Sequence, residues 1–245
     1  MTRLLYQTDS YLKDFEARVI AHEPETHAVI LDQSAFYPGG GGQPADSGYL
    51  SLPGSSCRIS RAKKAGEHVL HLVEGELPLP DIGSVVHGKI DWERRYQLMR
   101  THTAMHILCG VIFRAYGALV TGGDMDPLAG RMDFEFETMH KELVTEIEQS
   151  INREVSKAVA VEVKILAREA AFQIPDLIRT KINLLPDGIQ QVRVVEIVGL
   201  DLQADGGTHV HNTSEVGIIR IVDYKSKGKI NKRIYLELDS RPADS

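Results

Sequence analysis

The spacing of apolar residues changes near residue 90, and this change constrains the fold more than any other feature of the chain. Before it, short apolar stretches are separated by turn residues, with Glu23-Pro24-Glu25 between the first two. Evenly spaced short strands with glycine and proline between them favour a small barrel or sandwich. The predicted strands cover residues 17–21, 26–31, 57–60, 68–72 and 84–90.

After residue 90 the apolar spacing is helical. Residues 91–117 carry apolar side chains at steps of three and four, and residues 137–158 at steps of four, which predicts two long helices. Strands are expected at 161–166, 190–197, 217–224 and 233–238, with one or two helical turns at 167–172. Long helices packed on an antiparallel sheet are typical of an α+β domain. We therefore expect a small β-barrel domain over residues 1–90 and an α+β domain over residues 91–245.

Composition favours an ordinary globular protein. The 245 residues are 42% hydrophobic and 25% charged, which is enough apolar material to build a core. No apolar run approaches the roughly 20 residues that cross a bilayer, and the N-terminus lacks a signal-peptide core. The two cysteines, Cys57 and Cys109, are far apart, which argues against a disulfide framework. We therefore expect a cytoplasmic protein with no membrane partner.

Charge is unevenly distributed along the chain. The formal net charge of −6 argues against a generic nucleic-acid coat. Residues 135–154 are acid-rich, whereas residues 225–233 contain five lysine and arginine residues. Such a basic cluster is either a solvated surface or a local phosphate-binding surface on an otherwise acidic body.

His102 and His106 are the residues that point most directly to chemistry. On the predicted helix, positions i and i+4 lie on one face, so both imidazoles can bind one metal ion. A second segment, Asp205-Gly-Gly-Thr-His209, offers a carboxylate and a third imidazole at a glycine turn. Zinc takes four ligands, or three and a water at catalytic sites, so the pattern predicts a catalytic metal centre.

Each of these residues also has a structural interpretation. A histidine on an apolar helix face is often a hydrogen-bonded core residue, and Gly206-Gly207 is compatible with a simple turn. The glycines also allow close backbone approach and expose N–H groups. Thr208 either makes a local hydrogen bond or contacts a substrate. His211 is a weaker ligand candidate than His209.

Residues 35–48 form a second motif, with glycine at positions 39–42. It does not match a phosphate-binding P-loop, because no Gly-Lys-Ser/Thr follows and no helix is expected there. A long hairpin loop is the ordinary interpretation of four consecutive glycines. Gln43 and Asp46 are the polar groups that such a loop could present to a partner.

Four segments in this order carry a family resemblance. They are residues 35–48, Arg100-Thr-His-Thr-Ala-Met-His106, Arg131-Met-Asp-Phe134 and Gly206-Gly-Thr-His-Val210. Together they resemble the alanyl-tRNA editing proteins called AlaX, free-standing relatives of the editing domain of alanyl-tRNA synthetase. The resemblance covers nearly the whole chain, and the length is similar to that of the medium-sized AlaX type.

The resemblance implies a translation-factor-like N-terminal barrel followed by an α+β editing domain. It also implies an ATP-independent hydrolase that removes a wrong amino acid, chiefly serine and also glycine, from tRNA(Ala). The chemistry needs such a second site, because a pocket for alanine rejects glycine and serine only weakly by binding.

The resemblance also implies a ligand set. His102, His106 and His209 correspond to zinc ligands, one ion per chain, and the fourth position is usually a cysteine. Here that position is Asp205, which is either a fourth ligand or a neighbour of a three-histidine site. Because a carboxylate is harder than a thiolate, the native metal stays open at this stage.

Further roles follow as expectations. A metal-activated water would attack the ester, with the Gly206-Gly207 backbone stabilising the oxyanion. Polar selection of serine is expected from Thr103, Thr121 or Thr208. The glycine-rich loop, with Gln43 and Asp46, is expected to engage the acceptor end of the tRNA. Phosphate contacts are expected from Arg100, Lys225, Lys227, Lys229, Lys232 and Arg233.

Two other functions fit the same residues. One is a zinc hydrolase of small esters, which would show no preference for tRNA. The other is a tRNA- or synthetase-binding module whose metal is structural, and Asp205 is the feature that favours it. The sequence says nothing about the oligomeric state.

Overall fold

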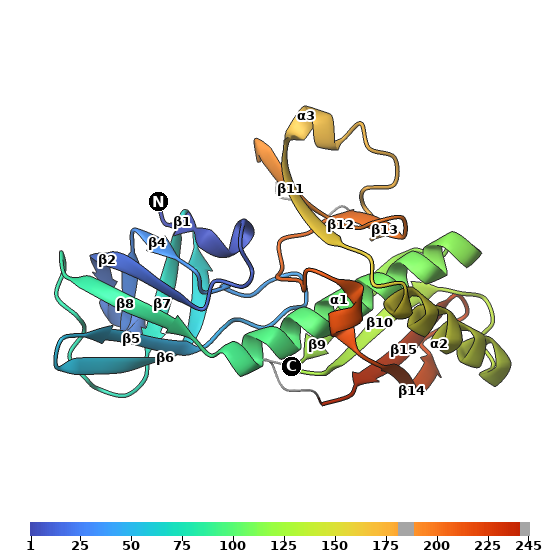
Figure 1. Ribbon diagram of the computed structural model, residues 1–245, viewed down its shortest axis with the longest axis horizontal. Coiled ribbons are helices and arrows are strands. Elements are labelled where there is room, and N and C mark those ends of the chain that lie inside the picture. The colour runs from blue at the N-terminus through green and yellow to red at the C-terminus, as the bar shows by residue number, and fades with distance from the viewer. Residues whose placement is uncertain (181–188, 241–245) are drawn as a thin grey trace. The chain divides into compact units, whose positions relative to one another are not determined.

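A computed structural model describes residues 1–180 and 189–240. The chain forms two compact units, residues 1–96 and 97–245 (Figure 1). No helix within the described residues is both long enough and apolar enough to span a membrane.

The first unit is a closed antiparallel barrel with the strand order β2-β3-β7-β6-β5-β8. The first two predicted strands form and pair with each other, because β2 pairs antiparallel with β3 from Val19↔Leu31 to Glu23↔Ala28. Burial alternates along β2 and β8, so every second side chain points into the barrel core. The barrel strands are β2 (Asp14–Glu23), β3 (Ala28–Leu31), β5 (Gly48–Leu52), β6 (Ser55–Ala65), β7 (His68–Val73) and β8 (Val85–Ile90).

Short elements complete this unit. The strands β1 (Arg3–Leu4) and β4 (Gln33–Ser34) pair in parallel, and two 3-10 turns cover Leu5–Gln7 and Pro24–Thr26. Gly88 is required by close packing, since a Cβ there would lie 2.5 Å from the Phe15 ring.

The second unit is built on a four-stranded antiparallel sheet with the order β14-β15-β10-β9. Two helices, α1 (Trp92–Tyr116) and α2 (Lys141–Ser156), pack with this sheet (Figure 1), and α1 begins in the first unit. The sheet is formed by β9 (Val120–Asp126), β10 (Ala129–Glu135), β14 (Ile219–Ser226) and β15 (Asn231–Leu238).

A smaller antiparallel sheet with the order β11-β12-β13 also belongs to the second unit. Its strands are β11 (Val161–Ala167), β12 (Gln191–Ile197) and β13 (Asp201–Ala204). The one-turn helix α3 (Arg168–Ala171) follows β11, and a 3-10 turn at Thr213–Val216 precedes β14. A separate apolar cluster around Val192 and Val194 packs this sheet against Ala171.

The predicted α+β class and the N-terminal barrel are confirmed. The expected helices form, although α2 begins at Lys141 rather than residue 137, because the His140 side chain caps it by accepting a hydrogen bond from Leu143 N. The sequence pattern does not predict strands β1, β4, β5, β9, β10 and β13. In β9 the cause is composition: the sequence VTGGDMD is rich in residues that are rare in strands, and the β10 partner supplies its pairing.

Candidate metal centre

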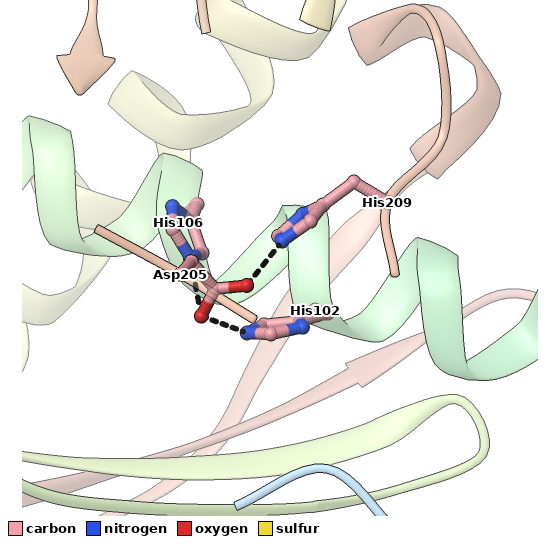
Figure 2. A group of neighbouring side chains, drawn as sticks. All are labelled: His102, His106, Asp205 and His209. Carbon is pink, nitrogen blue, oxygen red and sulfur yellow. Dashed lines mark hydrogen bonds and ion pairs between the residues drawn. The ribbon is translucent and has the colours of Figure 1, made fainter. Parts of the chain in front are cut away.

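Helix α1 brings the first two histidines of the site together. His102 and His106 are one turn apart, and their ring centroids lie 5.1 Å from each other. Both side chains are buried on the face of α1 that packs inside the second unit. Figure 2 shows both rings directed toward the same carboxylate. The pair predicted from the i, i+4 spacing is therefore formed.

The other two residues follow β13. Asp205 begins a tight turn in which Gly207 N donates to its Oδ1 at 2.7 Å, and this turn delivers His209 to the rings on α1. His209 stacks on His102 with centroids 4.2 Å apart and meets His106 edge to face at 4.7 Å. Segments about a hundred positions apart thus form one cluster.

Asp205 lies between the three imidazoles (Figure 2). Its carboxylate oxygens are 3.0 Å from His209 Nε2, 3.5 Å from His102 Nε2 and 3.9 Å from His106 Nε2. One ligand atom from each of the four residues lies within 4.8 Å of the others. The Asp205 side chain is 16% exposed and each imidazole less than 10%, so solvent reaches the cluster from the Asp205 side.

Two neighbours orient the rings. Asp201 Oδ2 lies 3.0 Å from His106 Nδ1, and a carboxylate can only accept, so this nitrogen carries the proton. Thr103 Oγ1 donates to Met99 O at 2.9 Å and lies 3.3 Å from His209 Nδ1, so it holds this ring in place. In both rings Nε2 is the nitrogen that faces the Asp205 carboxylate.

The pKa values of the three histidines are shifted in different directions. Burial lowers the pKa of His102 to about 4, more strongly than the attraction of Asp205 raises it, and burial also holds the pKa of His209 well below its usual range. At His106 burial is outweighed by hydrogen bonds to Asp201 and Asp205, which raise its pKa to about 9. The histidines together hold the pKa of Asp205 well below its usual range, although burial opposes this.

The donor set fits a metal ion. Three imidazole nitrogens and one carboxylate oxygen at these separations match the ligand types and number of a tetrahedral zinc site. The Asp201 contact at His106 is the outer-shell bond that metal-binding histidines usually make. An oxygen of the Asp205 carboxylate is the fourth candidate donor atom of this group.

The glycine turn offers one backbone donor. Gly207 N is used by Asp205, whereas Gly206 is exposed, and its N–H makes no hydrogen bond within the part of the chain that the structure describes. Thr208 is fully buried between this turn and His209. Gly206 N is therefore the backbone donor of this turn that is left for a ligand, whereas Gly207 N is occupied.

The other threonines differ in position. Thr103 lies in the cluster, where its hydroxyl also accepts from Val210 N at 3.3 Å, so it supports His209 and the following backbone. Thr121 is exposed on β9, and its hydroxyl donates to Asn231 Oδ1 at 2.9 Å.

Among the expected phosphate contacts, Arg100 requires a correction. Its guanidinium is fully buried and donates to Val216 O and Asp239, because α1 turns this side chain inward. Arg100 therefore has no exposed guanidinium surface that a phosphate could contact. Lys232 is also buried and donates to Gly228 O, whereas Lys227 and Lys229 are exposed on the β14–β15 hairpin.

In the barrel unit, Asp46 has an internal partner rather than an exposed position. Its carboxylate accepts from Arg95 Nε at 3.0 Å and from Tyr37 N at 2.6 Å, and both side chains of this ion pair are buried. Gln43 is 2% exposed, and its backbone pairs with Gly40. The expectation that Asp46 contacts a partner is not supported by this placement.

Three residues of the site were missed from the sequence. Asp201 contacts His106, Arg193 Nη1 donates to Asp205 O at 3.0 Å, and Gly110 gives room for Asp201 beside α1. The one sequence signal was an aspartate four residues before Asp205. The contact of Asp201 with His106 depends on how β13 packs beside α1, and a local sequence pattern does not predict that packing.

Comparison with known proteins relates both units to aminoacyl-tRNA synthetases. Residues 6–94 match the family model of class II (A) tRNA synthetases, and residues 192–235 match the threonyl and alanyl tRNA synthetase second additional domain. Both models describe parts of aminoacyl-tRNA synthetases. The alanine–tRNA ligase of Pyrobaculum aerophilum is 40% identical over 227 residues, which cover 90% of this chain and 25% of the ligase.

Free-standing relatives match over their whole length. The alanyl-tRNA editing protein AlaX-M of Saccharolobus solfataricus is 41% identical over 96% of this chain and 98% of its own. That of Methanosarcina barkeri is 36% identical over 97% of this chain and 99% of its own. The chain belongs to the AlaX-M family of alanyl-tRNA editing proteins.

Proposed function

We propose that this protein edits alanyl-tRNA synthesis by hydrolysing the ester that joins a wrong amino acid to tRNA(Ala), chiefly serine and also glycine. The observation that carries the proposal is the buried cluster of His102, His106, His209 and Asp205 in a chain of the AlaX-M family. The net reaction adds water across the ester. The carbonyl carbon gains the water oxygen, its bond to the ribose oxygen breaks, and that oxygen takes a proton.

Zinc is the metal that we propose for the cluster, one ion per chain, held by the three Nε2 atoms and an Asp205 oxygen. When bound, it would supply Lewis-acid polarisation of the ester and of water. The protein residues orient this centre: Asp201 fixes the His106 ring and Thr103 fixes the His209 ring. The Gly206 N–H would donate to the oxyanion that forms on the ester carbonyl.

Substrate approach is proposed from the Asp205 side, because the imidazoles are almost fully buried. Lys227 and Lys229 are proposed to bind phosphates of the tRNA from the β14–β15 hairpin. Replacing one such lysine by a neutral residue should reduce the salt dependence of tRNA binding by roughly 0.7 to 0.9 units of slope. A K227Q/K229Q variant with an unchanged slope would remove the hairpin from the tRNA-binding surface.

The direct test is release of serine from Ser-tRNA(Ala), with Ala-tRNA(Ala) measured alongside. We expect rapid release of serine with alanine spared, loss of activity after chelation, and recovery on addition of zinc. H102A/H106A should be inactive, whereas H211A, which removes an exposed imidazole outside the cluster, should keep full activity. Full activity of H102A/H106A would refute the proposed site.

The same assay separates the alternative functions. Equal hydrolysis of a small aminoacyl ester, with no preference for tRNA, would indicate an esterase of small substrates. Tight tRNA binding by a metal-loaded protein that releases neither amino acid would indicate a binding module.

A further inference from the structure

The barrel unit contains a second feature that the metal centre does not use. A hollow of about 740 Å³ opens between the glycine-rich loop, strand β6 and the first turn of α1. All of its lining residues belong to the unit formed by residues 1–96. Those that matter for its chemistry are Gly39, Gly40, Arg58, Arg61, Asp91 and Arg94.

Cationic side chains dominate the lining. Arg58 is held by Glu74 at 3.1 Å and by the Tyr49 hydroxyl at 2.9 Å. The guanidinium groups of Arg61 and Arg94 make no hydrogen bond or ion pair with any residue that the structure describes. These two guanidinium groups can therefore donate hydrogen bonds to an anion in the hollow.

Asp91 is the opposing charge in the lining, and it is already engaged. Its Oδ2 accepts from Ser47 Oγ at 3.3 Å, and its Oδ1 lies 3.5 Å from Arg94 N at the start of α1. The carboxylate therefore caps the helix instead of pairing with the Arg94 guanidinium. Arg58 is paired with Glu74, and the two remaining arginines outnumber the one hydrogen-bonded carboxylate, so the hollow is positive.

The glycine-rich loop forms a fixed rim. All four residues from Gly39 to Gly42 have positive φ, between 56° and 137°, a conformation that other residues adopt only with strain. The loop is held by the Tyr37 hydroxyl, which donates to Gly40 O at 2.9 Å, and by the Gly40–Gln43 bridge. The buried Asp46–Arg95 ion pair joins its far end to α1. A preformed rim without side chains allows a ligand to approach the backbone closely.

We infer that this hollow binds phosphate groups of the tRNA backbone, as a second attachment point on the barrel unit. This inference rests on the proposed function, which makes tRNA the ligand. A forked guanidinium matches the geometry of a phosphate oxygen pair. The volume lies within the range of about 300 to 1,000 Å³ of ordinary ligand pockets, so a backbone segment of nucleotide size fits.

The test is the R61Q/R94Q double variant, measured first by binding of uncharged tRNA(Ala). We expect the Kd to rise on the order of tenfold, and the salt dependence to fall by one to two units of slope. The matched control is R3Q/K64Q, which removes the same charge from exposed positions outside the hollow and should leave both quantities nearly unchanged. Thermal unfolding checks that both variants fold.

Two further measurements separate the possible causes. In the deacylation assay R61Q/R94Q should raise KM for Ser-tRNA(Ala) while kcat stays constant, and hydrolysis of a small aminoacyl ester should not change. Inorganic phosphate is the second probe: loss of its binding in R61Q/R94Q with an unchanged tRNA Kd would overturn the assignment to RNA. An equal loss of tRNA binding in the control would overturn it too, by indicating general charge attraction.

Because binding of uncharged tRNA is measured without hydrolysis, failure of the phosphate site and failure of the proposed function give different results. Failure of the wild type to release serine would refute the proposed function but leave the binding result readable. Unchanged binding of tRNA by R61Q/R94Q would refute the phosphate site even if editing activity is found.

Discussion

Two of the three imidazoles in the cluster are held at Nδ1 by polar side chains of different strength. Asp201 is fully buried and presents a carboxylate to His106, whereas Thr103 presents a neutral hydroxyl to His209. A charge-assisted hydrogen bond is roughly twice as strong as a neutral one. Asp201 also accepts from Gln203 Nε2 at 2.6 Å, so its own position is fixed. At the scale of single residues, it is the neighbour on which the cluster depends most.

We therefore expect D201N to lower zinc affinity tenfold to a hundredfold, since the amide keeps the shape but loses the charge that fixes His106. Competition with a chromophoric chelator measures this directly, without reference to activity. T103S retains the hydroxyl beside His209 and serves as the control, with an expected change of less than threefold. Unaltered zinc affinity in a folded D201N protein would show that His106 does not need this partner.

At the scale of elements, the site depends on how closely α1 approaches the turn before β13. Gly110 allows this approach, because a Cβ there would lie 2.9 Å from both Asp201 Cβ and Leu200 Cγ. Glycine inside a helix normally lowers stability by about 1 kcal/mol relative to alanine. Here the same glycine keeps Asp201 within reach of His106.

G110A is expected to destabilise the second unit by about 1 kcal/mol or more, because overpacking outweighs the gain in helix propensity. Zinc affinity should fall with it, as Asp201 moves away from His106. A115G, at an exposed position of the same helix, should cost about 1 kcal/mol by propensity alone and leave zinc affinity intact. Denaturant unfolding and zinc titration give both quantities, and a stabilised G110A would contradict the packing argument.

Elements with a strong local pattern could be predicted from the sequence. The i, i+4 histidines and the glycine turn with Asp205 and His209 are local, so the four cluster residues could be named without a structure. Strands β9 and β13 could not, because their pairing comes from neighbours rather than from their own composition. The buried roles of Arg100 and Asp46 could not either, since a charged residue looks the same in sequence whether its partner is internal or external.

At the scale of the whole molecule, the barrel unit buries a titratable histidine and the second unit holds the candidate metal centre. The barrel buries His71, whose ring contacts Ser34 Oγ at 2.7 Å and Val29 O at 3.2 Å. Burial lowers its pKa from 6.5 to about 4, although the Val29 carbonyl opposes the shift. Between these two values the unfolded chain binds more protons than the folded barrel, so acid favours unfolding.

The contribution of neutral His71 is therefore present above pH 6.5 and is lost as the pH falls through 4. Its size is about 3 kcal/mol, from the shift and 1.36 kcal/mol per pKa unit. H71Q should be less stable than the wild type at pH 7. Its stability should also fall less than that of the wild type between pH 6.5 and 4. Thermal unfolding of the barrel across this range measures it, and parallel curves for the two proteins would rule out His71 as the cause.

The positions of His106 and His209 in the chain have a consequence for unfolding. An ion bound by both residues would join positions about a hundred residues apart, which only the folded chain brings together. Binding free energy gained only in the folded state adds to stability. Saturating zinc should therefore raise the Tm of the second unit and leave the barrel transition in place. The time for which residues 97–245 stay folded would then depend on how much zinc is available to the protein.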